Sequence, residues 1–195
     1  MKLAVVALLL VLRVAHASVV VTYWTPRTVF MAADSRAAMP DGTPLPDVHK
    51  ITRHGRFLIG VTGLLRAPGF DLLAIIDGAQ GDGVMKMAES IVSAARPQLV
   101  TLPALDVPAA FTLTVAGFED GHAVVVLATL DGVRQLPGAS GYLATGHTAA
   151  IDASLAPMLS RSGERALPEL IQTEAAADAV YVGGPVQMLK LSAGD

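Results

Sequence analysis

The chain has 195 residues, of which 52 % are hydrophobic and 16 % are charged, and it contains no cysteine. This length suits one domain with a sizeable core, and so low a charge excludes a disordered chain. The absence of cysteine excludes disulfides, thiolate zinc sites and cysteine nucleophiles. A net charge of −3, without a run of basic residues, argues against a nucleic-acid partner.

Residues 1–17 have the three parts of a secretory signal peptide. Lys2 precedes an apolar run from Leu3 to Leu12, and Ala15-His16-Ala17 is a small-x-small cleavage sequence. The apolar run is too short to span a bilayer as a helix. We therefore expect removal of the leader, a mature domain of residues 18–195, a periplasmic or secreted location, and no membrane association once the leader is gone. The alternatives are a hydrophobic propeptide on a cytoplasmic protein and a buried first strand.

The first half of the mature chain alternates between strand-like and helix-like patterns. Runs rich in β-branched and aromatic residues, separated by the turns Thr25-Pro26-Arg27 and His54-Gly55-Arg56, predict two hairpins. Residues 39–47 contain three prolines and a glycine and predict a loop. Helical spacing follows, interrupted at Pro68-Gly69, and then an amphipathic helical pattern. The predicted strands are 19–24, 28–33, 48–53 and 57–62, and the predicted helices are 64–80 and 84–99.

The second half repeats this order after a linker at Pro103–Pro108. One hairpin turns at Glu119-Asp120-Gly121, and Gly183-Gly184-Pro185 separates the last two strands. The order of strands and helices is explained most simply by two packed sheets with helices on the outer face of each. We therefore expect an α+β fold, a four-layer αββα sandwich. The predicted strands are 111–117, 123–129, 141–145, 180–182 and 186–191, and the predicted helices are 148–159 and 163–177.

Ser18 carries both a hydroxyl and a free α-amine if it begins the mature chain. An α-amine has an ordinary pKa of about 7.7–8.0, so a useful fraction of it is neutral near pH 7. Such an amine can accept the hydroxyl proton, as histidine does in a serine hydrolase. The chemistry also needs a cation near the amine, a carboxylate that orients the cation, and backbone N–H donors for the oxyanion.

The sequence supplies a candidate for each of these groups. The first hairpin returns Asp34 to the start of the first strand, Lys50 flanks the third strand, and Arg36 follows Asp34 by two residues. Gly63 ends the fourth strand and can expose its N–H. Each candidate also has a structural interpretation: a capped turn at Asp34-Ser35-Arg36, a solvated lysine, and a glycine that only terminates a strand. The joint spacing favours the catalytic interpretation.

The segment SVVVTYWTPRTVFMAADSRAAMPDG, which begins at Ser18, resembles the start of a proteasome β-type subunit. These subunits belong to the N-terminal-nucleophile (Ntn) hydrolases, in which the first residue of the mature chain is the nucleophile. Placing Ser18 on that position puts Asp34, Arg36 and Lys50 on the catalytic Asp, Arg and Lys of the family without a gap.

Two further segments carry the same resemblance. IGVTGL at 59–64 resembles the strand that ends in the oxyanion glycine, which places Gly63 in that role. YVGGPVQMLKL near the C-terminus resembles the closing S-G-G-P-V-D-V element. The resemblance implies the sandwich fold, hydrolysis of amides, and assembly of copies of the chain into a homo-oligomer such as a ring.

The chain departs from the family pattern at several positions. Ser18 stands where a proteasome subunit has Thr, and His147 stands where its G-S-G element has a supporting serine. Near the C-terminus, Val182 takes the place of a serine, and Asp178 falls one residue early. These changes remove hydroxyls that would support the amine of the nucleophile. His147 is either a replacement polar group or a structural residue at the start of a helix.

We expect Ser18 to attack the scissile carbonyl of a peptide or small amide while its own amine carries the proton. In this interpretation Lys50 tunes the amine and hydroxyl, and Asp34 orients Lys50. Arg36 supports Asp34, and Gly63 donates to the oxyanion. No cofactor is needed, and the histidines of the chain fit no metal-binding spacing.

The alternative belongs to another class of protein. A ring-forming or binding protein would keep the same fold and would have lost turnover through the departures from the family pattern.

Overall fold

The computed structural model describes residues 18–38, 44–45, 48–101, 111–146, 149–179 and 182–195. These form a mixed α+β domain with antiparallel sheets, and the predicted α+β class is confirmed. The predicted leader and the predicted linker after the second helix lie outside the described residues. Among the helices that the structure describes, none is long and apolar enough to cross a membrane.

The first sheet has four strands in the spatial order β12, β1, β2, β13: β12 (Gly141–Thr145), β1 (Val20–Trp24), β2 (Thr28–Ala33) and β13 (Gln187–Ser192). Its centre is the predicted N-terminal hairpin, whose register pairs Val20 with Ala33. The turn is stabilised by Thr25, whose hydroxyl accepts a hydrogen bond from the N–H of Thr28 at 3.0 Å. The hairpin therefore brings the end of β2 next to the start of β1.

The second sheet has five strands in the order β11, β10, β9, β6, β5: β11 (Gly132–Gln135), β10 (His122–Thr129), β9 (Phe111–Glu119), β6 (Phe57–Gly63) and β5 (Ile51–His54). In the predicted turn between β9 and β10, Asp120 and Gly121 have φ of +49° and +77°. A two-residue hairpin turn needs these left-handed conformations. The sequence pattern does not predict β11, an edge strand whose residues are mostly exposed.

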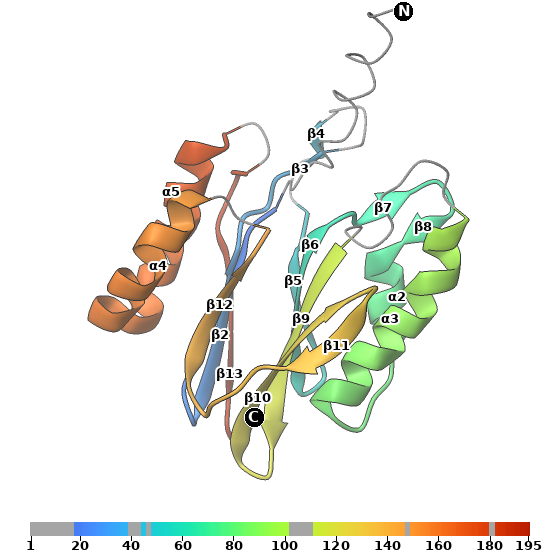
Figure 1. Cartoon of the computed structure of the whole chain (residues 1–195), viewed down its shortest axis with the longest axis horizontal. Coiled ribbons are helices and arrows are strands. Elements are labelled where there is room, and N and C mark those ends of the chain that lie inside the picture. Colours follow the sequence, from blue (N-terminus) through green and yellow to red (C-terminus); the bar gives the residue numbers. More distant parts are fainter. Residues whose placement is uncertain (1–17, 39–43, 46–47, 102–110, 147–148, 180–181) are drawn as a thin grey trace, which may run out of the picture.

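Helices cover the outer face of each sheet (Figure 1). α2 (Leu72–Gly78) and α3 (Val84–Val100) lie against the five-stranded sheet. α4 (Ala149–Ser162) and α5 (Leu167–Ala177) lie against the four-stranded sheet, and a 3₁₀ turn joins them. The two sheets face each other between these helix pairs.

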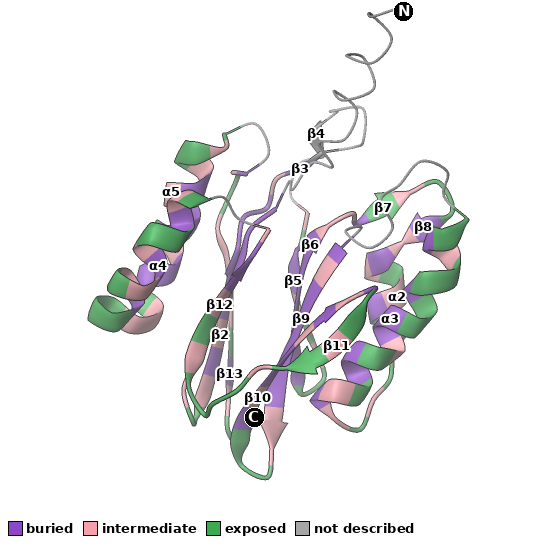
Figure 2. Ribbon diagram, viewed as in Figure 1, coloured by how far each residue is buried: buried purple, intermediate pink, exposed green. Residues whose placement is uncertain are grey.

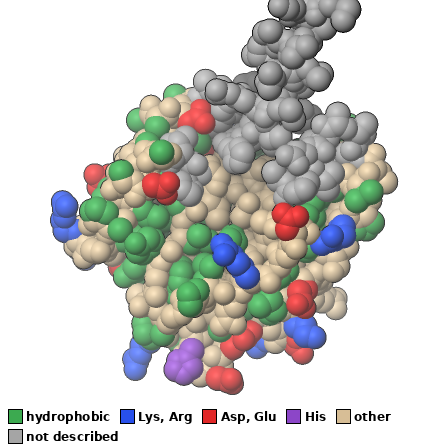
Figure 3. Space-filling view, in the orientation of Figure 1, with side chains coloured by type: hydrophobic (Ala, Val, Ile, Leu, Met, Phe, Trp, Pro, Cys, Tyr) green, Lys and Arg blue, Asp and Glu red, His purple; other side chains and the backbone are tan. Residues whose placement is uncertain are grey.

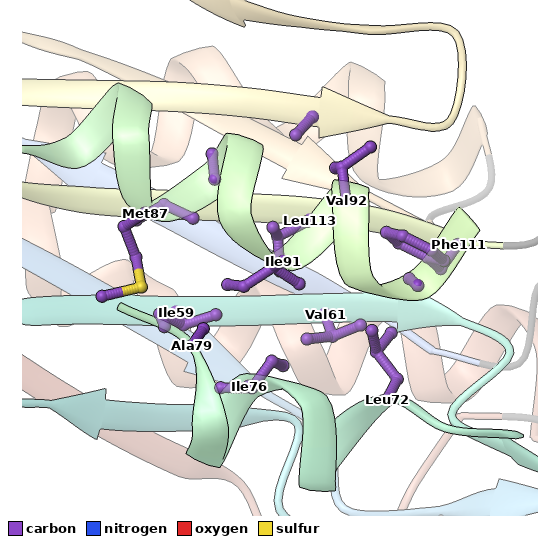
Figure 4. Packing of buried hydrophobic residues seen from close by; sticks show 14 of the residues in the cluster. Ile59, Val61, Leu72, Ile76, Ala79, Met87, Ile91, Val92, Phe111 and Leu113 are labelled. Atoms are coloured by element: carbon purple, nitrogen blue, oxygen red, sulfur yellow. The ribbon is translucent and has the colours of Figure 1, made fainter. Parts of the chain in front are cut away.

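Three apolar clusters fill the spaces between these elements. α3 buries the face that its sequence pattern predicts, including Met87 and Ile91, and exposes the opposite face (Figure 2). These side chains pack with Val61 and Leu113 of the five-stranded sheet (Figure 4). Removing one such side chain from water contributes about 1.5–3 kcal/mol, so this packing fixes the helix on the sheet.

The two sheets approach closely near the start of β1. A Cβ atom on Gly60 of β6 would lie 2.8 Å from Cγ1 of Val20. Only glycine fits at this distance, so Gly60 sets the separation of the sheets close to Ser18.

The segment 64–80, predicted as one interrupted helix, is instead a short hairpin followed by a short helix. The hairpin turns at Pro68–Gly69, where Gly69 has a φ of +81°. Asp71 then caps α2, because its carboxylate accepts from the N–H groups two and three residues later, both at 3.1 Å. The prediction was wrong because apolar runs this short do not distinguish strand from helix. The hairpin strands are β7 (Arg66–Ala67) and β8 (Phe70–Asp71).

The loop predicted at 39–47 also contains regular structure. β3 (Ala37–Ala38) pairs with β4 (Pro44–Leu45) as a short antiparallel ladder. Proline is compatible with such an edge position. The rest of this loop lies outside the described residues, as do residues 180–181 of a predicted strand, and Val182 is not in a strand.

Candidate active site

Ser18 is the first described residue and lies two residues before the start of β1, with only 1 % of its surface exposed. The next residue, Val19, donates its N–H to Oδ1 of Asp34 at 2.9 Å. The hairpin register explains this contact, because Val20 pairs with Ala33 and Val19 therefore comes level with Asp34. Ser18 is thus one residue from a direct contact with Asp34.

Asp34 is fully buried, and both of its carboxylate oxygens accept two hydrogen bonds. Oδ1 accepts from Nζ of Lys50 at 2.7 Å and from the N–H of Val19. Oδ2 accepts from the N–H of Gly183 at 3.1 Å and from that of Arg36 at 3.2 Å. A buried charge is tolerated only where it is paired and hydrogen-bonded, and these donors meet that need. They also fix the orientation of the carboxylate toward Lys50.

Lys50 directly precedes β5, and its side chain is fully buried beside Asp34. Its carbonyl accepts from the N–H of Val61 at 2.9 Å, and its N–H donates to Oε1 of Gln187 at 3.1 Å. Burial lowers the pKa of the Lys50 ammonium from the ordinary value of 10.5, the nearby carboxylate of Asp34 raises it, and the charge of Arg36 lowers it further. The net direction is downward, so Lys50 gives up a proton more readily than a surface lysine.

Arg36 holds the turn that carries Asp34. Its guanidinium donates to the carbonyl of Ala179 and lies so close to Gly183 that a Cβ there would be 2.9 Å from the guanidinium carbon. The N–H groups of Ser35 and Arg36 both donate to the carbonyl of Gly183, at 3.1 and 3.0 Å. The backbone of Gly183 therefore belongs to the site, a role that the closing motif in the sequence does not reveal.

Gly146 lies against the carbonyl of Ser18 on one side and Thr62 on the other, and the sequence pattern indicates neither Gly146 nor Thr62 as a site residue. A Cβ on Gly146, whose φ is +65°, would lie 2.7 Å from Cβ of Thr62 and would overlap the carbonyl oxygen of Ser18. Gly63 follows Thr62 at the end of β6, with a φ of +93°, and pairs with Phe111 of β9. Its role as an oxyanion donor stays a prediction.

One of the departures from the family pattern, Val182, directly precedes Gly183, which donates to Asp34. Val182 packs in the apolar cluster beneath α4 and α5, and its N–H donates to the carbonyl of Asp178 at 2.9 Å. It therefore supplies packing where the family has a hydroxyl. His147 lies outside the described residues, and its role stays a prediction.

On the face that Figure 3 shows, basic and acidic side chains are interspersed. A hollow of about 590 Å³ lies beside α2 and is lined by Arg66 and Asp71 among others, and its lining includes neither Ser18 nor Lys50. In the part of the chain that the structure describes, no three metal-ligating side chains come together.

Comparison with known proteins gives matches among solved structures. BPH of Thiobacillus denitrificans, solved in complex with epoxomicin, superposes with a TM-score of 0.65 at 16 % identity, over 91 % of this chain and 100 % of that one. Anbu, an ancestral β-subunit from Yersinia bercovieri, gives 0.66 at 11 % identity, over 89 % and 81 %. HslV from Trypanosoma brucei gives 0.62 at 17 % identity, over 89 % and 99 %.

No protein-family model and no curated protein matches the chain. The structural matches span about nine-tenths of the chain, at identities that establish the fold alone. The resemblance stated from the sequence is confirmed at that level. The chain has the fold of the proteasome-like N-terminal-nucleophile hydrolases.

Proposed function

We propose that this chain is an Ntn amide hydrolase with four-layer αββα architecture, activated when removal of residues 1–17 gives Ser18 a free α-amine. One observation carries the proposal: Oδ1 of Asp34 binds the buried ammonium of Lys50 and also accepts the N–H of Val19, the residue next to Ser18. A buried ion pair contributes little to the stability of a fold, because the cost of desolvating the two charges offsets their attraction. Catalysis gives a better reason for this pair to lie beside a potential nucleophile.

In the proposed reaction the α-amine of Ser18 accepts the proton of the Ser18 hydroxyl as Oγ bonds to the amide carbon. The oxyanion that forms accepts a hydrogen bond from the N–H of Gly63. The ammonium then protonates the leaving nitrogen, the C–N bond breaks, and an ester on Ser18 remains. Water then loses a proton to the amine and attacks the ester carbon. The ammonium returns this proton to Oγ as the C–O bond breaks, which releases a carboxylic acid and restores the hydroxyl and the neutral amine.

Lys50 would assist this cycle through its charge. A cation beside the α-amine lowers the pKa of the amine and so increases its neutral fraction. Because burial lowers the pKa of Lys50 itself, proton exchange between Lys50 and Ser18 would cost less than with a solvated lysine. Asp34 orients Lys50, and Arg36 holds the turn of Asp34.

The proposed substrates are peptides or small amides, and the reaction uses no cofactor. The leader suits export to the periplasm or beyond, with a hydrophobic propeptide of a cytoplasmic protein as the alternative. A compartment without ATP cannot support an energy-dependent unfoldase, so short or small substrates fit an exported enzyme better than folded proteins. We also propose that copies of the chain form a homo-oligomer.

An inactive ring-forming or binding protein is the second candidate. The buried Val182 favours it, because this side chain cannot give the hydrogen bonds that a serine would give at that place. Covalent labelling separates the two candidates.

The protein is purified, shown by N-terminal sequencing to begin at Ser18, and treated with an electrophilic peptide amide mimic. Mass spectrometry then locates the adduct. The proposed hydrolase gains one adduct on Ser18, the Ser18→Ala variant gains none, and a control change at the exposed Ser160→Ala on α4 leaves labelling intact. A folded chain that begins at Ser18 and takes up no adduct supports the binding protein instead.

A further inference from the structure

We infer that Gln187 is a positioning residue for Lys50, and this inference rests on the proposed function. Its side-chain amide makes two hydrogen bonds to the segment that leads into β5. Oε1 accepts from the N–H of Lys50 at 3.1 Å, and Nε2 donates to the carbonyl of Val48 at 2.8 Å.

The carbonyl of Val48 and the N–H of Lys50 belong to residues i and i+2, so in an extended segment they point to the same side. A neighbouring β-strand would normally pair such an N–H and C=O, but this segment precedes β5, the last strand of the five-stranded sheet. The amide of Gln187 therefore takes the place of a missing strand at this point.

The position of Gln187 on its own strand makes this contact relevant to the ion pair. Gln187 begins β13 and pairs with Ala33, the residue directly before Asp34. The side chain thus reaches from the strand beside β2, whose end leads into Asp34, to the segment that contains Lys50. It connects the two sheets at the place where Lys50 must meet Asp34.

Other contacts hold the same segment but do not replace this one. The carbonyl of Lys50 accepts from Val61, and the N–H of Val48 donates to the carbonyl of Ser35 at 2.9 Å. Without Gln187, the N–H of Lys50 and the carbonyl of Val48 would lose their partners on the open edge. The segment would then shift toward water, which would lengthen the contact of Lys50 with Asp34 and expose the ammonium.

The test measures Lys50 directly as well as turnover. Mature protein is labelled with ¹³C at lysine Cε and titrated by NMR, which is feasible because the mature chain has only Lys86 and Lys190 besides Lys50. The charged groups that act on Lys50 are Asp34 and Arg36 together with the proposed α-amine, and all are unchanged in the test variants. In Gln187→Met the side chain keeps its length and loses both hydrogen bonds.

We expect Lys50 of the wild type to titrate below the ordinary value of 10.5, and Gln187→Met to move its pKa upward toward that value. We also expect kcat to fall about tenfold with KM unchanged, because a small displacement of a catalytic group affects the transition state more than substrate binding. The control is Met188→Gln at the neighbouring, 44 % exposed position, which should match the wild type in both measurements.

Wild-type titration or wild-type kcat in Gln187→Met overturns the inference. If that variant does not fold, Gln187→Glu takes its place, since it still accepts from Lys50 but sets an oxygen against the carbonyl of Val48. This variant should also lose turnover, and wild-type kcat there overturns the inference equally. The proposed function and the positioning role fail on different results. If the wild type itself hydrolyses no amide and takes up no label, the proposed function fails. An unchanged Lys50 titration in Gln187→Met refutes the positioning role.

Discussion

The N–H of Val19 and the ammonium of Lys50 bind the same carboxylate oxygen of Asp34, at 2.9 and 2.7 Å. One acceptor therefore sets the position of the main chain next to the proposed nucleophile and of the cation beside it. A change in Asp34 must alter both, whereas a change in Lys50 leaves the backbone contact in place.

Replacing Ser18 with Ala should abolish covalent labelling and amide hydrolysis, because the hydroxyl that attacks is gone. The buried site before β1 accommodates the smaller side chain, so the thermal unfolding midpoint should stay close to that of the wild type. Ser18→Thr should retain activity, since it keeps hydroxyl and amine. Amide hydrolysis at the wild-type rate by Ser18→Ala would falsify the mechanism.

Lys50→Met should lower kcat by about two orders of magnitude or more, the scale of a lost acid–base or electrostatic partner. It should also destabilise the fold by about 3–5 kcal/mol, because Asp34 keeps its buried charge without its counter-ion. Steady-state kinetics and urea unfolding measure the two effects. Lys86→Met on the exposed side of α3 is the matched control and should change neither.

The lowered pKa of Lys50 gives stability a dependence on pH. Between the folded-state pKa and the ordinary value of 10.5, the unfolded chain binds more protons at Lys50 than the folded chain does. The free energy of unfolding therefore gains a contribution that is fully present above 10.5 and is lost as pH falls through the folded-state pKa. Urea unfolding of wild type and Lys50→Met over this range should show the rise only in the wild type. Parallel curves would mean that the pKa of Lys50 does not change on folding.

Gly146→Ala should disable the site. The new Cβ would overlap the carbonyl oxygen of Ser18 and crowd Thr62, so the proposed nucleophile would be displaced. The control is Gly55→Ala, which has a similar φ of +58° but open space around its Cβ. Both changes should cost about 1–2 kcal/mol of backbone strain, and only Gly146→Ala should lose labelling. Equal labelling of the two variants would show that Gly146 does not position Ser18.

The intact chain should be inert, because the nitrogen of Ser18 is then an amide without a basic lone pair. Removal of residues 1–17 should switch the protein on, and a peptidase that reads Ala15-His16-Ala17 is the expected activator. The measurement compares the uncleaved chain with one that begins at Ser18, each verified by mass spectrometry. Equal hydrolysis by both would refute the role of the amine and of the leader together.

Much of the site could be predicted from the sequence because it is built on a local hairpin. The alternating pattern and the turn at Thr25 fix the register of the hairpin. This register places Asp34 opposite Val19. The position of Lys50 near Asp34 could be predicted because it requires only that the next strand begin at the same end of the fold. The amphipathic pattern of α3 is equally local and was confirmed in full.

The parts that could not be predicted depend on contacts between distant segments. Gln187 acts through its side-chain amide on backbone groups more than one hundred residues away, and no spacing rule encodes such a contact. The same holds for Gly146, whose need for glycine comes from Thr62 and Ser18. The hairpin of β7 and β8 was missed because its strands are too short to show a period.

The carboxylate of Asp34 takes one of its donors from Gly183, which lies 149 residues further along the chain. During synthesis the N-terminal hairpin and Lys50 leave the ribosome long before Gly183 does. Closing so long a loop is a late step of folding, so Asp34 has its full set of donors only when nearly the whole chain has been made. In a growing chain the carboxylate that contacts Lys50 therefore lacks one of its donors until the segment around Gly183 has been made.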